Sequence, residues 1–140
     1  MFRQIVCLQQ NDLSCAFHAI ANAKKLLATD GQSVISIDEA HAIDRAASID
    51  LYLHTLGRCA GTEEVAKYKS SGGIVLDYLE NDTIIPNLHF IQTVNRLVSN
   101  EISKFSCILK FKTHAIALYF DKDSNNRVKI SFADSDYPHL

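Results

Sequence analysis

The sequence predicts an α+β domain in which helices come first and an antiparallel sheet comes last. Apolar residues recur at helical spacing in the first half of the chain, and capping and turn residues bound those segments. The last third holds three runs rich in Ile, Val, Phe and Tyr, which favour strands. Helices and strands that are segregated along the chain are typical of α+β rather than α/β folds.

The first helix is expected from Leu13 to about Ala28, because its apolar positions form a single stripe. These positions are Cys15, Ala16, Ala19, Ile20, Ala23, Leu26 and Leu27. Suitable N-cap residues precede them, namely Asn11, Asp12 and Ser14. The turn residues TDG at positions 29–31 end the helix.

A second helix is expected over Ser36–Leu56, opening with the capping-box pattern SIDE, with a break near Ser48 as an alternative. A short helical turn is expected at Thr62–Val65 and a third helix over Ile74–Glu80. Between them, Ser71–Gly73 lacks the GK[ST] continuation of a phosphate loop, so we interpret it as a linker turn.

The remainder changes to strands. We expect a strand over Leu88–Val94, a short helix over Asn95–Lys104, and then strands over Ser106–Phe111, Ala115–Phe120 and Arg127–Phe132. The tetrapeptide DSNN at positions 123–126 predicts a hairpin turn between the last two. Alternation in the last strand points three residues inward: Val128, Ile130 and Phe132.

Length and charge narrow the classes of function. The chain has 140 residues and 15.6 kDa, which allow one domain over positions 1–140 that buries roughly 68% of its extended surface. Its net charge of −2 lacks the basic surplus of a nucleic-acid binder. We find neither an apolar run long enough to span a bilayer nor a signal peptide. We therefore expect a monomer without a membrane segment or a nucleic-acid partner.

The cysteines indicate a reducing compartment. None of the four forms a CxxC pair, so a structural zinc site is not expected, and neither is another metal or cofactor. Two disulfides are an alternative, but a core of this size does not need them, and we interpret the cysteines as free thiols of a cytoplasmic protein. The four are Cys7, Cys15, Cys59 and Cys107.

Cys15 is a candidate nucleophile, because the N–H groups and dipole of a helix start favour the thiolate. His114 opens a predicted strand and is a candidate base, and Asp134 ends the next strand and is a candidate orienting partner. A hairpin centred near residue 124 places these two side by side. Asp136 and Asn125 remain rivals of Asp134 in that role.

Two glutamines precede the candidate nucleophile. Gln9 and Gln10 lie six and five residues before Cys15, and a side-chain amide at such a position donates to an oxyanion together with the Cys15 backbone N–H. The spacing leaves open which of the two serves.

Other polar residues have plainer interpretations. His18 lies three residues after Cys15 and is either a second candidate base or a packing histidine, and we favour packing. We expect Asn22 to hydrogen-bond a loop. The remaining histidines are interpreted as surface or satisfied core groups: His41, His54, His89 and His139.

The segment QQNDLSCAFHAIANAKKLL resembles the nucleophile helix of Josephin-type cysteine proteases, which carry a Gln five residues before Cys-Ala-x-His-Ala/Cys-Leu/Ile-x-Asn. The segment HAIALYFDKD…VKISFADSD resembles the second motif of that family, in which a His opens one strand and an Asn or Asp lies on the next. The matching residues are Gln10, Cys15, Ala16, His18, Ala19, Ile20, Asn22, His114 and Asp134.

The resemblance implies a papain-like fold and a thiol protease with a Cys15–His114–Asp134 triad. Its substrates would be amide or isopeptide bonds of ubiquitin or ubiquitin-like conjugates, which is the activity of a deubiquitinase. Papain-like folds also host glutamine deamidases and transglutaminases, among them bacterial effectors that act in the host cytosol. A non-catalytic interaction protein on the same scaffold is the third alternative.

Overall fold

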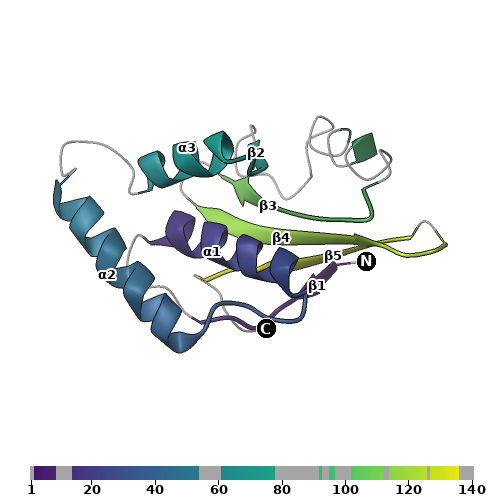
Figure 1. Ribbon diagram of the computed structural model, residues 1–140, viewed down its shortest axis with the longest axis horizontal. Coiled ribbons are helices and arrows are strands. Elements are labelled where there is room, and N and C mark those ends of the chain that lie inside the picture. Colours follow the sequence, from purple (N-terminus) through teal and green to yellow (C-terminus); the bar gives the residue numbers. More distant parts are fainter. Residues whose placement is uncertain are drawn as a thin grey trace.

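The computed structural model describes residues 2–8, 14–53, 61–77, 92, 95–96, 102–111, 114–125 and 127–135. Within these residues the fold is mixed α+β, and helices lie across one face of a twisted sheet (Figure 1). The strand order is β1-β5-β4-β3-β2. The elements are β1 (Phe2–Gln4), α1 (Cys15–Ala28), α2 (Ile37–Leu53), α3 (Thr62–Ser70), β2 (Val75–Asp77), β3 (Lys104–Lys110), β4 (Ala115–Lys122) and β5 (Val128–Ala133).

The sheet contains the predicted antiparallel meander but is wider than predicted. β3, β4 and β5 pair in sequence order as antiparallel neighbours. β1 and β2 extend the two edges and pair in parallel with β5 and β3. The prediction of a purely antiparallel sheet is therefore wrong at its edges. Both edge strands are three residues long, too short to show an alternating pattern in the sequence.

The prediction of a helix over Ile74–Glu80 is wrong, because Val75–Asp77 forms β2. Val75 and Leu76 pair with Ile108 and Leu109 of β3, so the backbone partners of this short apolar run come from a distant strand. An apolar run this short does not distinguish a helix from a buried strand. Residues 78–80 lie outside the described residues.

The other helices follow the predictions with changed bounds. α1 begins at Cys15, and α2 continues through Ser48 without a break. The Ser36 hydroxyl accepts from the Glu39 N–H, and the Glu39 carboxylate accepts from the Ser36 N–H, which completes the predicted capping box. α3 has nine residues, where only a short turn was predicted. The end predicted at Leu56 lies outside the described residues.

Little of the segment between β2 and β3 is described. Gln92 is helical, so the strand predicted over Leu88–Val94 is wrong at that residue. Asn95 and Arg96 are helical, as predicted, whereas Lys104 begins β3 instead of ending a helix. The rest of both predictions lies outside the described residues.

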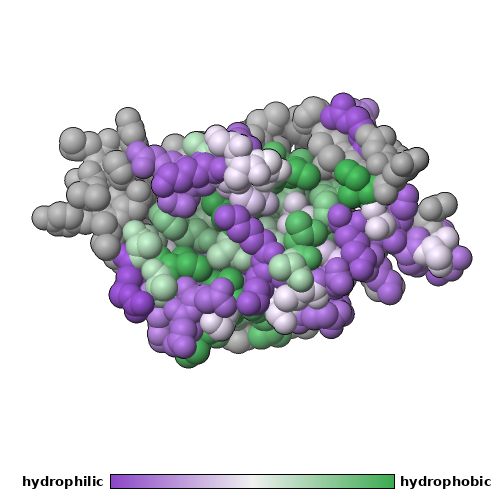
Figure 2. Space-filling view, in the orientation of Figure 1, coloured by the Kyte–Doolittle hydropathy of each residue, from purple (hydrophilic) through white to green (hydrophobic). Residues whose placement is uncertain are grey.

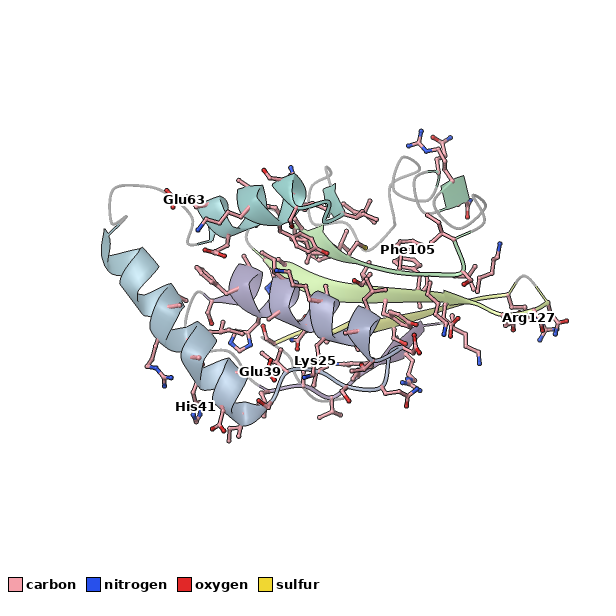
Figure 3. The ribbon with its side chains drawn as sticks, viewed as in Figure 1. Lys25, Glu39, His41, Glu63, Phe105 and Arg127 are labelled. Carbon is pink, nitrogen blue, oxygen red and sulfur yellow. The ribbon has the colours of Figure 1, made fainter. Side chains whose placement is uncertain are left out.

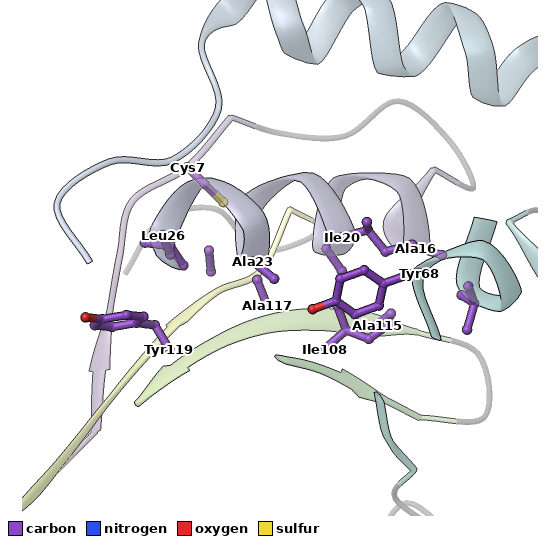
Figure 4. Close-up of a cluster of buried hydrophobic side chains, with 13 residues drawn as sticks. Cys7, Ala16, Ile20, Ala23, Leu26, Tyr68, Ile108, Ala115, Ala117 and Tyr119 are labelled. Carbon is purple, nitrogen blue, oxygen red and sulfur yellow. The ribbon is translucent and has the colours of Figure 1, made fainter. Parts of the chain in front are cut away.

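The main core lies between α1 and the sheet, and it fixes the direction of the helix. Five of the seven predicted stripe residues of α1 are buried in this core, namely Ala16, Ala19, Ile20, Ala23 and Leu26. The prediction is wrong for Leu27, which is exposed, and Cys15 is only partly buried. Figure 4 shows Ala16 and Ile20 near Ala115, and Leu26 at the end of β4 that carries Tyr119. The helix start therefore lies at the same end of the sheet as the start of β4.

The opposite face of the sheet has its own apolar cluster. It contains alternate residues of β3 and β4, among them Phe105, which stacks on Phe120 with ring centroids 4.5 Å apart. Val128, Ile130 and Phe132 of β5 pack against this cluster, so the predicted alternation is confirmed. A strand with apolar side chains on both faces has a nearly continuous hydrophobic sequence, so β3 and β4 could be predicted from the sequence.

An exposed ion pair links α1 to α2. Lys25 of α1 and Glu39 of α2 lie side by side in Figure 3, with Nζ 3.5 Å from Oε1. Both side chains are exposed, so this ion pair contributes little to stability.

Figure 2 shows hydrophilic and hydrophobic residues interspersed over the same face. The exposed large hydrophobic residues of the described part are scattered, namely Val6, Leu27, Ile37 and Ile102.

Gly61 fixes how closely α3 approaches the start of α1. It precedes α3 with φ of +91°, and a Cβ there would lie 2.8 Å from the Ala16 Cβ. Gly61→Ala is expected to lower the free energy of unfolding by about 2 kcal/mol or more, from the left-handed backbone and the clash together. Gly72→Ala is the matched control, because Gly72 has φ of +93° and no atom near its Cβ position.

Urea unfolding of both variants tests this prediction. The Gly72 variant should lose only the cost of the backbone conformation, about 1 kcal/mol. Equal losses in the two variants would show that contact with Ala16 does not limit the approach of α3.

Candidate active site

Cys15 is the first residue of α1 and is partly exposed. The unpaired N–H groups of a first helical turn and the positive end of the helix dipole stabilise an anion at this position. The first turn contains no acidic residue that would oppose this effect. Cys15 therefore lies at a helix start, with its side chain partly open to the outside of the protein.

His114 and Asp134 form the ion pair that the hairpin predicted. His114 precedes β4 and Asp134 follows β5, and Nε2 lies 2.7 Å from Oδ1. The side chains are 21% and 15% exposed, so the pair is shielded from water but can be reached from outside. Phe111 lies beside the imidazole, with ring centroids 6.4 Å apart, and its N–H donates to the His114 carbonyl.

The register that produces this pair differs from the predicted one. Lys122 pairs with Val128, which centres the hairpin on residue 125 instead of 124. This register makes Asp134 a diagonal neighbour of His114 instead of the residue directly across from it. Diagonal neighbours are about 7–8 Å apart, a distance that two long side chains bridge. Both groups lie just beyond the last printed pair of the β4–β5 ladder, and the backbone of His114 is held by the bond from the Phe111 N–H to its carbonyl.

The environment of His114 stabilises its protonated form. The hydrogen bond to Asp134 is the main cause that raises the pKa of His114 from 6.5 to about 10, and a side-chain hydrogen bond with Cys15 is the next. Burial opposes the shift. Because Asp134 occupies Nε2, Nδ1 is the ring nitrogen that remains for the Cys15 sulfur. The structure thus brings together three of the sequence-predicted residues, one from α1 and two from the ends of β4 and β5.

A second His–Asp pair lies close by, and its surroundings distinguish it from the first. His18 of α1 is completely buried, with Nε2 2.8 Å from Oδ1 of Asp44 in α2. Ser14 donates its hydroxyl to the same oxygen at 3.0 Å. His18 is thus enclosed between two helices, as the packing interpretation requires, whereas His114 is accessible.

Asp44 was missed at the sequence level, although a signal was present. Ala40 and Ala47 of α2 are buried, and Asp44 lies on the same helix face, four residues after one and three before the other. A carboxylate within an apolar stripe needs a buried polar partner. Such a partner was available in His18, which lies within the corresponding stripe of α1.

The prediction for Asn22 is confirmed. Its side-chain oxygen accepts from the Ile35 N–H at 3.1 Å, and both residues are buried. This bond ties the loop between α1 and α2 to the middle of α1.

The other described thiols have surroundings that suppress reactivity. Burial is the main cause that raises the pKa of Cys7 to about 11, and the charge of Asp134 adds to it. Burial alone raises the pKa of Cys107, which is fully enclosed in the sheet. The described cysteines are free thiols, as predicted, and Cys59 lies outside the described residues.

Several predicted participants are not placed. Gln9 and Gln10, the two candidates for the oxyanion, lie outside the described residues, and so does Asp136. Asn125 lies in the β4–β5 turn, where its N–H donates to Asp123, so it is at the far end of the hairpin from His114. No group of three potential metal ligands occurs among the residues that the structure describes.

Within the described ranges, no helix combines the length and hydropathy needed to cross a bilayer. Comparisons with protein-family models, with curated proteins and with solved structures gave no match to this chain.

Proposed function

We propose that this protein is a papain-like thiol hydrolase that cleaves amide or isopeptide bonds with Cys15, His114 and Asp134. The observation that carries the proposal is the double engagement of His114. Its imidazole is bound by Asp134 on Nε2 and by the Cys15 thiol, which lies at a helix start. A nucleophile, a base and an orienting carboxylate in contact along one line are the arrangement that nucleophilic acyl transfer requires.

Each residue has a defined task in the proposed reaction. The Cys15 proton resides on His114, whose pKa is raised to about 10, and the sulfur attacks the carbonyl carbon, whose oxygen becomes an oxyanion. The imidazolium then protonates the leaving amine, and the C–N bond breaks to leave a thioester. Water, deprotonated by His114, hydrolyses the thioester and restores the thiol. Asp134 keeps the ring oriented and stabilises its positive charge through both steps.

The proposed oxyanion donors are the Cys15 backbone N–H and the side-chain amide of Gln10 or Gln9. The backbone N–H of the first helical residue has no acceptor within its own helix, so it is suited to this task. The upstream glutamine is supported by its spacing from Cys15. Two donors at the oxyanion are the usual number for acyl transfer.

The proposed substrate class is a conjugate of ubiquitin or of a ubiquitin-like protein in the cytoplasm. It is supported by the resemblance of the Cys15 helix and of the His114 and Asp134 strands to Josephin-type proteases. A reducing compartment also suits the chemistry, because the reaction needs Cys15 as a free thiol.

A ubiquitin probe with a C-terminal electrophile tests the proposal. We expect the wild-type protein to form a covalent adduct, seen as a mass increase of one probe, and Cys15→Ala to form none. If the wild type is not labelled while iodoacetamide still modifies Cys15 rapidly at pH 6, ubiquitin is the wrong substrate class. Slow modification by both reagents would refute the hydrolase itself.

A further inference from the structure

A polar cluster made of two buried side chains and one carboxylate that is 15% exposed joins the start of α1 to the middle of α2. It consists of Ser14, His18 and Asp44, which we call the Asp44 cluster. A single oxygen of Asp44 accepts from the Ser14 hydroxyl at 3.0 Å and lies 2.8 Å from His18 Nε2. Ser14 and His18 are 1% and 0% exposed. The cluster flanks Cys15 on both sides along the chain, one residue before it and three after it.

Because it belongs to the Asp44 cluster, the Ser14 side chain does not make the hydrogen bond that is usual for an N-cap serine. A serine in the N-cap position usually accepts an N–H of the first turn with its side-chain oxygen. Ser14 makes no such side-chain bond and donates its hydroxyl to Asp44 instead. Its backbone carbonyl still accepts from the His18 N–H at 3.1 Å, so the helix begins normally. The Ser14 side chain therefore does not occupy the first-turn N–H groups around Cys15.

Burial of the His18 ring has a free-energy cost. Its Nδ1 is buried and has no hydrogen-bond partner among the described residues. Buried polar atoms are normally paired, and exceptions are concentrated at functional sites. An apolar side chain of similar size would fill the same space without an unpaired nitrogen. The specific contribution of the ring is thus the bond between Nε2 and Asp44.

We propose that the Asp44 cluster positions Cys15 against His114 by anchoring the first turn of α1 to α2. This inference rests on the proposed function. Ser14, His18 and Asp44 are positioning residues, because the bonds that define the cluster run among them and act on Cys15 through the helix start. His114 is fixed by the sheet, so the thiol meets its ring only when the helix start is fixed as well. A shift of about 1 Å at such a contact reduces reactivity by up to about 100-fold.

The test is the pH dependence of the reaction of Cys15 with iodoacetamide, with intact-mass analysis to assign the site. An ordinary thiol reacts about 200-fold faster at pH 9 than at pH 6, whereas an ion-paired thiolate changes by less than about tenfold. We expect the wild type to show the small ratio and Asp44→Ala to move toward the large one. Asp44→Asn, which keeps an acceptor oxygen, should restore a small ratio.

Two further variants make the test decisive. Asp38→Ala removes an exposed carboxylate from the same helix and should match the wild type. Ser14→Ala removes only one hydroxyl, so it decides the question if Asp44→Ala does not fold, and its ratio should rise. Small ratios in folded Asp44→Ala and Ser14→Ala would overturn the positioning role while leaving the hydrolase intact. A large ratio in the wild type would overturn the proposed function itself.

Discussion

Cys15→Ala is expected to abolish amide hydrolysis, with a loss in kcat of at least about 10⁴-fold. The reason is that neither of the other two described thiols can replace it. Burial raises the pKa of Cys7 and of Cys107, and both lie within the core beneath or inside the sheet. Removing Cys15 leaves the Asp134–His114 pair without a nucleophile. The measurement is turnover of a ubiquitin C-terminal amide that releases a fluorophore.

Cys107→Ala is the matched control for this experiment. It removes one thiol from the opposite face of the sheet and should keep kcat within about twofold of the wild type, at a stability cost of about 1 kcal/mol. Residual turnover in Cys15→Ala above about 0.01% of wild type would contradict its role as the nucleophile.

Asp134→Ala is expected to lower kcat/KM by about 10²-fold or more, because the His114 ring loses its orientation and the partner of its positive charge. Asp134→Asn separates these two contributions. The amide retains an oxygen for Nε2, so orientation is largely kept, but the negative charge is lost. We therefore expect Asp134→Asn to retain more activity than Asp134→Ala. Equal activity of Asp134→Ala and the wild type would contradict the orienting role.

Loss of Asp134 or of Cys15 should also change the pKa of His114. Asp134 is the main cause of the pKa of about 10, so Asp134→Asn should shift that pKa toward 6.5, and Cys15→Ala should shift it less. Imidazole chemical shifts measured by NMR between pH 5 and pH 11 report both values. A pKa that stays near 10 in Asp134→Asn would show that another group holds the proton on the ring.

The free energy of unfolding should depend on pH, because folding raises the pKa of His114. The pKa of His114 is higher in the folded state than the ordinary 6.5, so its contribution is fully present below pH 6.5 and is lost as pH rises to about 10. Urea unfolding in a Cys15→Ala background, which removes proton exchange with the thiol, should show a larger cost of Asp134→Asn at pH 6 than at pH 10. Each unit of pKa lost corresponds to about 1.4 kcal/mol at the lower pH.

Local patterns in the sequence were sufficient for the long elements. The apolar stripe of α1, the capping box of α2 and the three strands of the meander are encoded by residues close together in the chain, so they were predicted nearly in full. The His114–Asp134 pair was also predictable, because a single hairpin connects the two residues. These features depend on short-range periodicity and turn chemistry.

Features that depend on distant partners were not predictable. β2 is a strand because β3 supplies its hydrogen bonds, and β1 is a strand because β5 does. The partners of Asp44 also depend on long-range packing, because only the placement of α2 against α1 brings its carboxylate to Ser14 and His18.

By itself, the sequence determined an α+β chain with one thiol at a helix start and one His–Asp pair at the end of a hairpin. The tertiary structure alone decided that this thiol meets this histidine. Ala16, Ala115 and their neighbours let α1 lie closely along β4 in the same direction, which brings both starts to one end of the sheet. The structure also decided which of two His–Asp pairs is accessible. Burial and long-range packing are properties of the folded chain, and no local pattern encodes them.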